Sequence, residues 1–344
     1  MTSRGTDVVM TRSQTGVRRR LLSGMQPSGR LHLGNWLGAL DTWVAAQQTH
    51  DCFFFVADWH ALSTNYADTA NIRSWTREMI IDWLSAGLDP ERSTLFVQSR
   101  IPEHAVLHVI LSMITPVPWL ERNPTYKEKQ EELKERDLAT YGFLGYPVLQ
   151  AADILIYRPD DVPVGVDQVP HLELCREIAR RFNRLYAKEV FTEPAALLAT
   201  DAKKIPGTDG RKMSKSYNNA IYLSDTEPAV REKLRTMVTD PARVKRTDKG
   251  NPDVCPVFSL HKVLSPPAVI ERVDRECRTA AIGCIDCKKL VADALVAKLT
   301  PLWETRKEIE RHPGQVDEII GQGCAKAQTV ARETLSQVYD AIGL

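Results

Sequence analysis

The stretch GMQPSGRLHLGN, residues 24–35, contains residue types suited to binding phosphate. A Gln-Pro-Ser-Gly turn leads to His32 and Asn35, just before the apolar run WLGAL (36–40) of a predicted helix. Glycines let a backbone approach a ligand closely, and the free N–H groups at a helix start attract anions. His32 and Asn35 could donate hydrogen bonds where negative charge develops on a phosphate. An ordinary turn before an ordinary helix would contain the same residue types, so this stretch alone leaves both interpretations open.

A second stretch, KMSKS at residues 212–216, places two lysines around a small hydroxyl residue. It follows IPGTDGRK (205–212), whose Pro and Gly indicate a loop. Lysine ammonium groups can follow the charge of a triphosphate, and serine hydroxyls can hydrogen-bond its oxygens. A solvated basic loop would explain Lys-x-x-Lys alone, but the full string is much rarer by chance. Together the two stretches predict a nucleotide site.

The segment YPVLQAADILIY (146–157) would gather polar residues on one side if it is helical. On one face of such a helix lie Tyr146, Gln150, Asp153 and Tyr157. A polar face in an otherwise apolar helix should contact a ligand or a partner. The alternative is a solvent-facing stripe, and the apolar neighbours of Asp153 argue against it.

Four of the seven cysteines follow the pattern C-x21-C-x6-C-x2-C. They are Cys255, Cys277, Cys284 and Cys287. In a reducing compartment, clustered cysteines suggest metal or redox chemistry more than disulfides. Four thiolates can hold zinc or an iron–sulfur cluster, and spacing does not separate the two. Only the Cys-x-x-Cys pair is a sharp signal, so Cys255 and Cys277 could also be unrelated buried thiols.

The elements that must position these residues alternate between strand and helix in the first half of the chain. Short apolar runs at 21–25, 52–58 and 94–99 are each followed by a helix-like segment, and a fourth strand is predicted at 162–166. The segment 72–87 has helical periodicity and ends on glycine, as a crossover helix should. This alternation predicts an α/β fold with a parallel sheet. After about residue 225 the pattern becomes helical, which suggests a second domain.

Composition places few further limits on function. The 344 residues are 43% hydrophobic and 26% charged, with a formal net charge of +1. Nucleic-acid contact must therefore come from local basic patches. No stretch approaches the roughly 18 apolar residues of a membrane span, and the basic start resembles a mobile tail at 1–20 more than a signal peptide. A cytoplasmic protein is expected.

The two stretches, taken together, resemble the signature sequences of class I aminoacyl-tRNA synthetases. The first signature normally reads His-Ile-Gly-His, and here it reads HLGN (32–35). Asparagine at that position, preceded by Gln-Pro-Ser-Gly, is typical of the bacterial tryptophanyl branch. The resemblance covers residues 21–344 and continues through ADWHAL (57–62), ERNPTYKEK (121–129), YPVLQAADI (146–154) and PVGVDQ (163–168).

This resemblance implies a fold, a reaction and partners. It implies a Rossmann-type catalytic domain with a parallel sheet at 21–224, and an α-helical domain at 225–344 that binds the tRNA anticodon. A helical insertion around 100–145 would form the interface of a homodimer. The implied reaction activates L-tryptophan with ATP and Mg²⁺ to tryptophanyl-adenylate and transfers it to tRNA(Trp). Neither DNA nor a membrane is an expected partner.

The resemblance also implies roles for individual residues. The implied catalytic residues are His32, Asn35, Lys212 and Lys215. The implied ATP-binding residues are Gln26, Pro27, Ser28, Gly34, Asn35, Gly165, Val166, Asp167, Ile205, Lys212, Met213, Ser214, Lys215 and Ser216. The implied tryptophan-binding residues are His60, Tyr146, Gln150, Asp153 and Gln168. A subgroup of the branch carries a [4Fe–4S] cluster on similarly spaced cysteines, which favours iron–sulfur over zinc at Cys255, Cys277, Cys284 and Cys287.

Asp153 is the implied selector of the amino acid, because indole has one N–H that only donates. Relatives often carry Met where Gln150 stands and Glu where Val166 stands. Because Gln150 replaces the usual Met, a tyrosyl enzyme remains an alternative. A synthetase-like paralogue with a regulatory binding role is a second alternative. A small nucleotidyltransferase is disfavoured, because such enzymes lack KMSKS and the long helical C-terminal domain.

Overall fold

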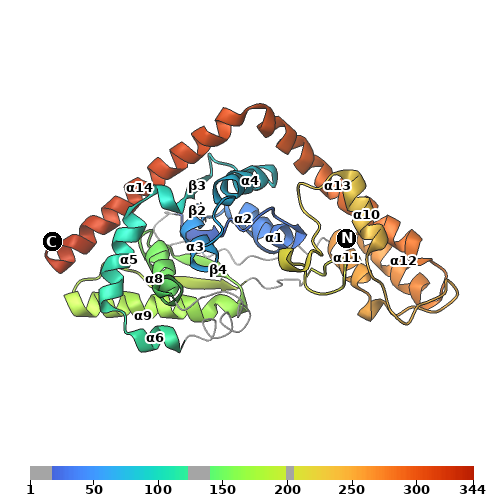
Figure 1. The fold of residues 1–344 in the computed structure, drawn as a ribbon, viewed down its shortest axis with the longest axis horizontal. Helices are drawn as coiled ribbons and strands as arrows, with labels where there is room; N and C mark the ends of the chain where they lie inside the picture. Colours follow the sequence, from blue (N-terminus) through green and yellow to red (C-terminus); the bar gives the residue numbers. More distant parts are fainter. Residues whose placement is uncertain (1–17, 123–139, 199–204) are drawn as a thin grey trace.

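The computed structural model describes residues 18–122, 140–198 and 205–344. Most of the predicted tail at 1–20 lies outside these ranges. So do the middle of the predicted insertion around 100–145 and most of ERNPTYKEK (121–129). Figure 1 shows the described chain as a sheet flanked by helices, with two long helices spanning the molecule.

A five-stranded parallel sheet lies at the centre of the N-terminal part. Its strands are β1 (Arg20–Met25), β2 (Asp51–Val56), β3 (Ser93–Val97), β4 (Asp161–Val164) and β5 (Ala195–Leu198). Their spatial order is β3-β2-β1-β4-β5, and every neighbouring pair is parallel. The predicted Rossmann-type fold is confirmed. The edge strand β5 was not predicted, because its four exposed residues, AALL, form a short apolar run that is as typical of a helix as of a strand.

Helices follow the strands as the alternating pattern predicts. They are α1 (Leu33–Asn35), α2 (Asp41–Ala46), α3 (Asp58–Asn65), α4 (Ile72–Ser85), α5 (Glu103–Ile114), α6 (Val117–Glu121), α8 (Tyr141–Leu155) and α9 (Val169–Tyr186). A π-helical turn at Trp36–Leu40 joins α1 to α2. The predicted crossover helix at 72–87 is therefore α4, which ends two residues earlier.

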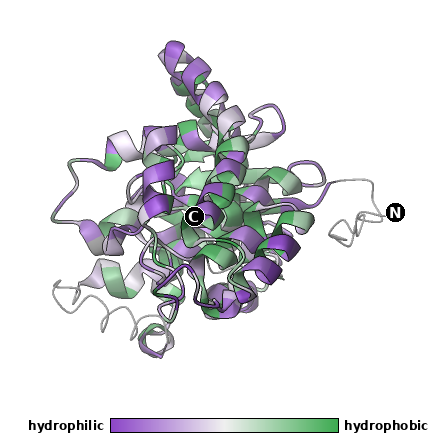
Figure 2. Ribbon diagram, turned by 90° about the vertical axis from the view of Figure 1, so that its right-hand side faces the viewer, coloured by the Kyte–Doolittle hydropathy of each residue, from purple (hydrophilic) through white to green (hydrophobic). Residues whose placement is uncertain are grey.

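The hydrophobic core lies between the sheet and its helices. Trp43 of α2 stacks on Phe54 of β2 with ring centroids 4.6 Å apart, and meets Trp83 of α4 edge-on at 5.2 Å. Figure 2 shows hydrophobic residues concentrated towards the middle of the molecule and hydrophilic ones around them. This core holds the carboxyl ends of the strands in fixed positions.

The strand order predicts a ligand crevice beside β1. The chain proceeds from β1 to β2 on one side, while β4 pairs with β1 on the other. In open parallel sheets, ligands bind outside the carboxyl ends of the strands where the order reverses in this way. Residues 26–29, which follow β1, and residues 165–168, which follow β4, therefore lie at the expected position of a ligand.

The C-terminal part is helical. It contains α10 (Glu227–Thr236), α11 (Pro256–Leu264), α12 (Pro267–Arg278), α13 (Cys284–Arg311) and α14 (Pro313–Ile342). In Figure 1, α13 and α14 meet at an apex, and α14 runs back past β3 to the C-terminus. No helix in the described ranges combines the length and the apolar character needed to cross a bilayer.

Candidate active site

The residues after β1 form a tight loop whose shape depends on glycine. Gly29 has φ +111°, a left-handed conformation that side chains rarely adopt. Pro27 is buried, Gln26 is half-buried, and Ser28 is exposed at the crevice. A side chain at Gly34 would crowd His32, because a Cβ atom there would lie 3.0 Å from the imidazole ring. The loop therefore presents backbone and small side chains to any ligand.

His32 and Asn35 hold one another through reciprocal capping bonds. The Asn35 amide donates to His32 Nδ1 at 3.3 Å, and the His32 amide donates to Asn35 Oδ1 at 3.1 Å. Because Nδ1 accepts this bond, the proton of a neutral ring belongs on Nε2, which can donate to a ligand. Burial and the positive charge of Lys215 lower the pKa of His32 to about 4. His32 is therefore a neutral donor at neutral pH.

The KMSKS loop is shaped by Asn219. Its Oδ1 accepts the Ser214 amide at 2.8 Å, and its Nδ2 donates to Asp209 at 2.7 Å and to the Lys212 carbonyl at 3.2 Å. The Met213 amide donates to the Ile205 carbonyl at 2.9 Å, and both side chains are buried. The Ser216 amide donates to Ser214 Oγ, while Lys212 and Ser216 remain exposed. Asn219 was not predicted, since an Asn in a loop carries no sequence signal of its own.

Lys215 brings the two signature stretches together. Its Nζ donates to the Gly29 carbonyl at 3.0 Å and lies 3.3 Å from Ser28 Oγ. Burial lowers the pKa of Lys215 to about 8, and the negative charge of Asp82 acts in the opposite direction. A half-buried ammonium beside an exposed hydroxyl and a neutral imidazole is suited to an anionic ligand.

Asp153 lies at the centre of a second, buried group. Its side chain is 1% exposed, and its carboxylate oxygens meet His60 Nε2 at 2.7 Å and His104 Nδ1 at 2.7 Å. Gln98 Nε2 donates to both oxygens at 2.9 Å. Burial alone would raise the pKa of Asp153, but the hydrogen bonds from His104 and His60 lower it to about 2. Asp153 is thus a fully buried carboxylate anion.

A further hydrogen bond fixes the position of His104 beside Asp153. His104 Nε2 lies 2.8 Å from the Tyr157 hydroxyl, and both side chains are fully buried. His104 was not predicted, because a histidine in the mainly apolar helix α5 looks like a core residue. Gln98 was missed for a similar reason, since it follows β3 without a motif around it.

The other predicted amino-acid contacts lie on neighbouring elements. Tyr146 is buried on α8, and its hydroxyl lies 3.2 Å from His171 Nε2. Gln150, one turn before Asp153, is half-buried. Gln168 ends the short helix η3 (Val166–Gln168), which also contains Asp167 and follows Gly165. Val166 is 78% exposed, so only its backbone is positioned to contact a ligand tightly.

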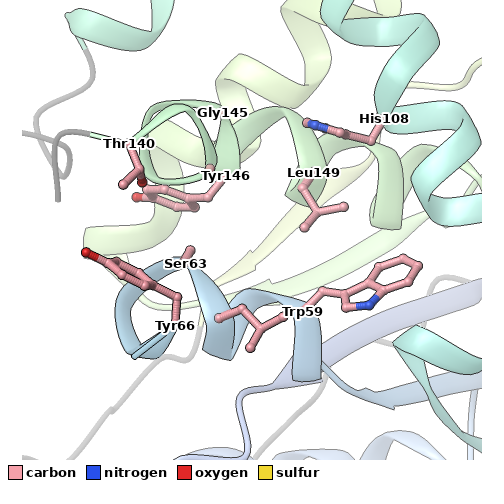
Figure 3. Close-up of a pocket in the computed structure, with 10 residues that line it drawn as sticks. Trp59, Ser63, Tyr66, His108, Thr140, Gly145, Tyr146 and Leu149 are labelled. Carbon is pink, nitrogen blue, oxygen red and sulfur yellow. The ribbon is translucent and has the colours of Figure 1, made fainter. Parts of the chain in front are cut away.

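A pocket of about 320 Å³ opens between α3, α5 and α8 (Figure 3). Its lining is mainly apolar and includes Trp59 and Leu62 of α3, His108 of α5, and Leu149 of α8. Tyr146 also lines it, which connects the pocket to the predicted amino-acid site. The other predicted contacts of the amino acid are not among its lining residues.

The four cysteines of the C-terminal part gather around the start of α13. Cys284 and Cys287 lie in its first turn, Cys277 is near the end of α12, and Cys255 precedes α11. Burial and, to a smaller extent, the other three thiols raise the pKa of Cys287 to about 12. Cys287 Sγ lies 3.5 Å from His261 Nε2. Within the described ranges, no three His, Cys, Asp or Glu side chains lie close enough together to hold a metal ion.

Comparisons with known proteins show what the whole chain is similar to. The family model described as tRNA synthetases class I (W and Y) matches residues 14–300. The chain is 51% identical to the tryptophan–tRNA ligase of Thermotoga maritima, over 94% of this chain and 99% of that protein. It is 45% identical to the corresponding ligase of Ralstonia nicotianae, over 94% and 98%. A structure of Campylobacter jejuni tryptophanyl-tRNA synthetase with ADP and tryptophan is 34% identical, with a TM-score of 0.85, over 94% of this chain and 100% of that one.

Proposed function

Because the chain belongs to the class I tRNA synthetases for tryptophan and tyrosine, we propose that it is a tryptophan–tRNA ligase. The observation that carries this proposal is the match of nearly the whole chain to tryptophan–tRNA ligases at up to 51% identity. The enzyme joins L-tryptophan to tRNA(Trp) in two steps, through tryptophanyl-adenylate. The tyrosyl alternative is disfavoured, since relatives that are 42%, 45% and 51% identical to this chain carry the tryptophan name.

In the first step, a carboxylate oxygen of tryptophan attacks the α-phosphorus of ATP. The new O–P bond forms as the bond to the bridging oxygen breaks, and pyrophosphate leaves with Mg²⁺. Such a reaction needs positioning and charge stabilisation more than a covalent nucleophile. The neutral His32 donates to phosphate through Nε2, and Lys215 and Lys212 balance the charge of the leaving pyrophosphate. Asn35 acts by fixing the His32 ring.

The rest of the ATP site consists of residues around these donors. Gln26, Pro27, Ser28 and Gly34 form the loop after β1, and Gly165, Val166 and Asp167 follow β4 at the other side of the crevice. Ile205 and Met213 place the KMSKS backbone, while Ser214 and Ser216 offer hydroxyls. The proximity of Lys215 to Ser28 and Gly29 supports this assignment.

Tryptophan recognition is assigned to Asp153 and its neighbours. A carboxylate can accept about four hydrogen bonds, and His60, His104 and the two contacts of Gln98 already account for four at Asp153. An indole N–H would therefore replace one of the two Gln98 contacts. The buried anion also makes a ligand without a matching donor costly to bind. Tyr146 and Gln168 hold the amino group, and Gln150 lies against the ring.

We propose that Cys255, Cys277, Cys284 and Cys287 hold a [4Fe–4S] cluster, with zinc as the alternative. A set of four thiolates suits either group. Arg243 supports the site, because its Nη1 lies 3.7 Å from Cys277 Sγ and a cation stabilises thiolates. Bound there, the cluster would brace the start of α13.

The assembly and the domain roles are also proposals. The homodimer is supported by large apolar side chains exposed around the proposed insertion, namely Val109, Met113, Val117 and Tyr141. Such a cluster is costly to leave in water, and a second copy related by two-fold symmetry would cover it. The helical region at 225–344 is proposed to contact the tRNA anticodon, while residues 21–224 activate the amino acid.

Pyrophosphate exchange with each amino acid tests the function. We expect ATP-dependent exchange with tryptophan and not with tyrosine, followed by charging of tRNA(Trp). Asp153→Asn keeps the shape but removes the charge, and Lys212→Ala removes a lysine of KMSKS. The first should raise the KM for tryptophan at least tenfold with little effect on ATP, and the second should do the reverse. Exchange with tyrosine alone would refute the proposal, and adenylate formation without charging would favour the regulatory paralogue.

A further inference from the structure

A buried ion pair joins the C-terminal part of the chain to the sheet domain. Arg306 of α13 donates from Nη1 to Asp82 Oδ1 of α4 at 2.6 Å, and the side chains are 11% and 2% exposed. Arg306 also contacts Glu78 of α4 and Glu310 of its own helix. Neither Arg306 nor Asp82 belongs to the motifs described above.

Asp82 faces the signature loop on its other side. Burial raises the pKa of Asp82 to about 6, while Arg306 and a hydrogen bond from the Leu31 amide oppose that rise. Leu31 directly precedes His32. The charge of Asp82 also reaches Lys215, whose pKa it raises against the effect of burial. One carboxylate therefore contacts the residue before His32 and acts on the half-buried lysine of KMSKS.

A second contact from α13 leads to the same place. Trp303, about one turn before Arg306, donates from Nε1 to the Leu223 carbonyl at 2.9 Å. The Leu223 amide donates to the Leu31 carbonyl at 2.9 Å, and Tyr222 forms an antiparallel bridge with His32. Arg306 thus supports the Leu31 amide through Asp82, and Trp303 supports the Leu31 carbonyl through Leu223.

An ion pair at this depth is not explained by stability alone. Removing two charges from water costs free energy, and replacing a buried pair by packed apolar side chains is often neutral or stabilising. Breaking the pair by removing one partner is strongly destabilising, because a buried charge is left alone. An ion pair that faces a catalytic loop can instead be retained because it fixes the positions of the residues in that loop.

We propose that Asp82 and Arg306 are positioning residues that hold residues 31–32 and Lys215 in place for ATP. Through them, α13 connects the cysteine-bearing region at its start to the adenylation site near its end. The inference rests on the proposed activation of tryptophan by ATP. It adds two residues, one from each part of the chain, that touch no substrate but set the geometry of those that do.

Three variants and a matched control test this proposal. Arg306→Met leaves Asp82 buried and unpaired, and Asp82→Leu/Arg306→Met removes the whole pair. Arg306→Lys keeps a positive charge. Arg311→Met makes the same change in the same helix but breaks only an exposed pair with Glu308. Pyrophosphate exchange gives kcat and KM for ATP and for tryptophan separately, and thermal unfolding gives the midpoint temperature of each variant.

We expect Arg306→Met and the double variant to lower kcat/KM for ATP about 10- to 100-fold, the effect of misplacing reacting groups by a fraction of an ångström to an ångström. The KM for tryptophan should stay within about twofold. The double variant should recover part of the midpoint temperature but not the ATP kinetics. Arg306→Lys should recover both in part, and Arg311→Met should match the parent protein.

A double variant with normal ATP kinetics would overturn the proposal, because the pair would then serve stability alone. Equal losses in Arg311→Met would also overturn it, since the effect would not be specific to Asp82. Failure of the proposed function is a different result, because the parent protein itself would then show no exchange with tryptophan.

Discussion

Charge at the candidate active site is controlled residue by residue through burial. His32 stays neutral because it is partly buried beside a lysine, whereas Asp153 stays charged because buried donors surround it. The same physical effect, loss of solvation, is outweighed at Asp153 by hydrogen bonds and is reinforced at His32 by the charge of Lys215. Each side chain is thereby held in the protonation state that its proposed role requires.

The lowered pKa of Lys215 predicts a pH dependence for ATP use. Burial brings the pKa of Lys215 down to about 8, so the free enzyme loses this positive charge as pH rises through that value. kcat/KM for ATP should fall above about pH 8, while kcat should hold to higher pH because bound phosphates stabilise the protonated lysine. On the acid side, His32 should remain neutral down to about pH 4.

Steady-state pyrophosphate exchange between pH 6 and 10 measures this dependence, with Lys215→Arg as the comparison. Arginine keeps its charge throughout that range, so the alkaline fall should disappear even if the overall rate is lower. An unchanged alkaline fall in Lys215→Arg would assign the titration to another group.

Among the elements, α14 achieves an unusually close contact with the sheet. A Cβ atom on Gly323 would lie 1.8 Å from the carbonyl oxygen of Leu95 in β3, so only glycine allows the helix to approach this strand. A Cβ atom on Gly321, two residues earlier on α14, would meet no atom within 4 Å. The two glycines of GQGC thus have opposite roles in one helix.

Alanine substitutions at these two glycines give a matched prediction. Gly323→Ala should lower the free energy of unfolding by about 1–3 kcal/mol, because α14 must move away from β3. Gly321→Ala should raise the free energy of unfolding by about 0.5–1 kcal/mol, because alanine has less conformational freedom than glycine in the unfolded chain and a higher helix propensity. Urea unfolding of both variants is the measurement. Equal effects of the two substitutions would contradict the close contact.

At the scale of the whole molecule, α13 connects the cysteine region to the crevice at the sheet. Cys284 and Cys287 lie at its start, and Trp303 and Arg306 lie near its end. Figure 1 shows this helix descending from the apex to the region of α10, α11 and α12. Anything that braces its first turn therefore also steadies the helix that supports residues 31–32.

Metal content tests the proposed cluster. Protein purified without oxygen should contain iron and acid-labile sulfide and should absorb broadly in the blue part of the visible spectrum. Cys284→Ser should lose the iron, whereas Cys324→Ala should keep it, because Cys324 lies on α14 beside β3 and outside the four-cysteine group. Stoichiometric zinc without iron would overturn the cluster and support a zinc site. The absence of both metals would show that the four thiols are packing residues.

Much of the fold was predictable from local patterns. The apolar runs at 21–25, 52–58 and 94–99 became β1, β2 and β3, and the helical period at 72–87 became α4. Strand and helix periodicities depend on neighbouring residues, so they can be read directly from a sequence. The exposed edge strand β5 could not, because its residues have no buried face to produce a pattern.

By itself, the sequence determined the residue types of the site, in HLGN, KMSKS and YPVLQAADI, and with them the family. Only the tertiary structure decided their partners: that Lys215 meets Ser28 and Gly29, and that His104 orders Asp153. The same holds for Arg306, which reaches Asp82 across 224 residues. Motifs occupy consecutive positions and leave a signature, whereas contacts between distant elements depend on packing and leave none.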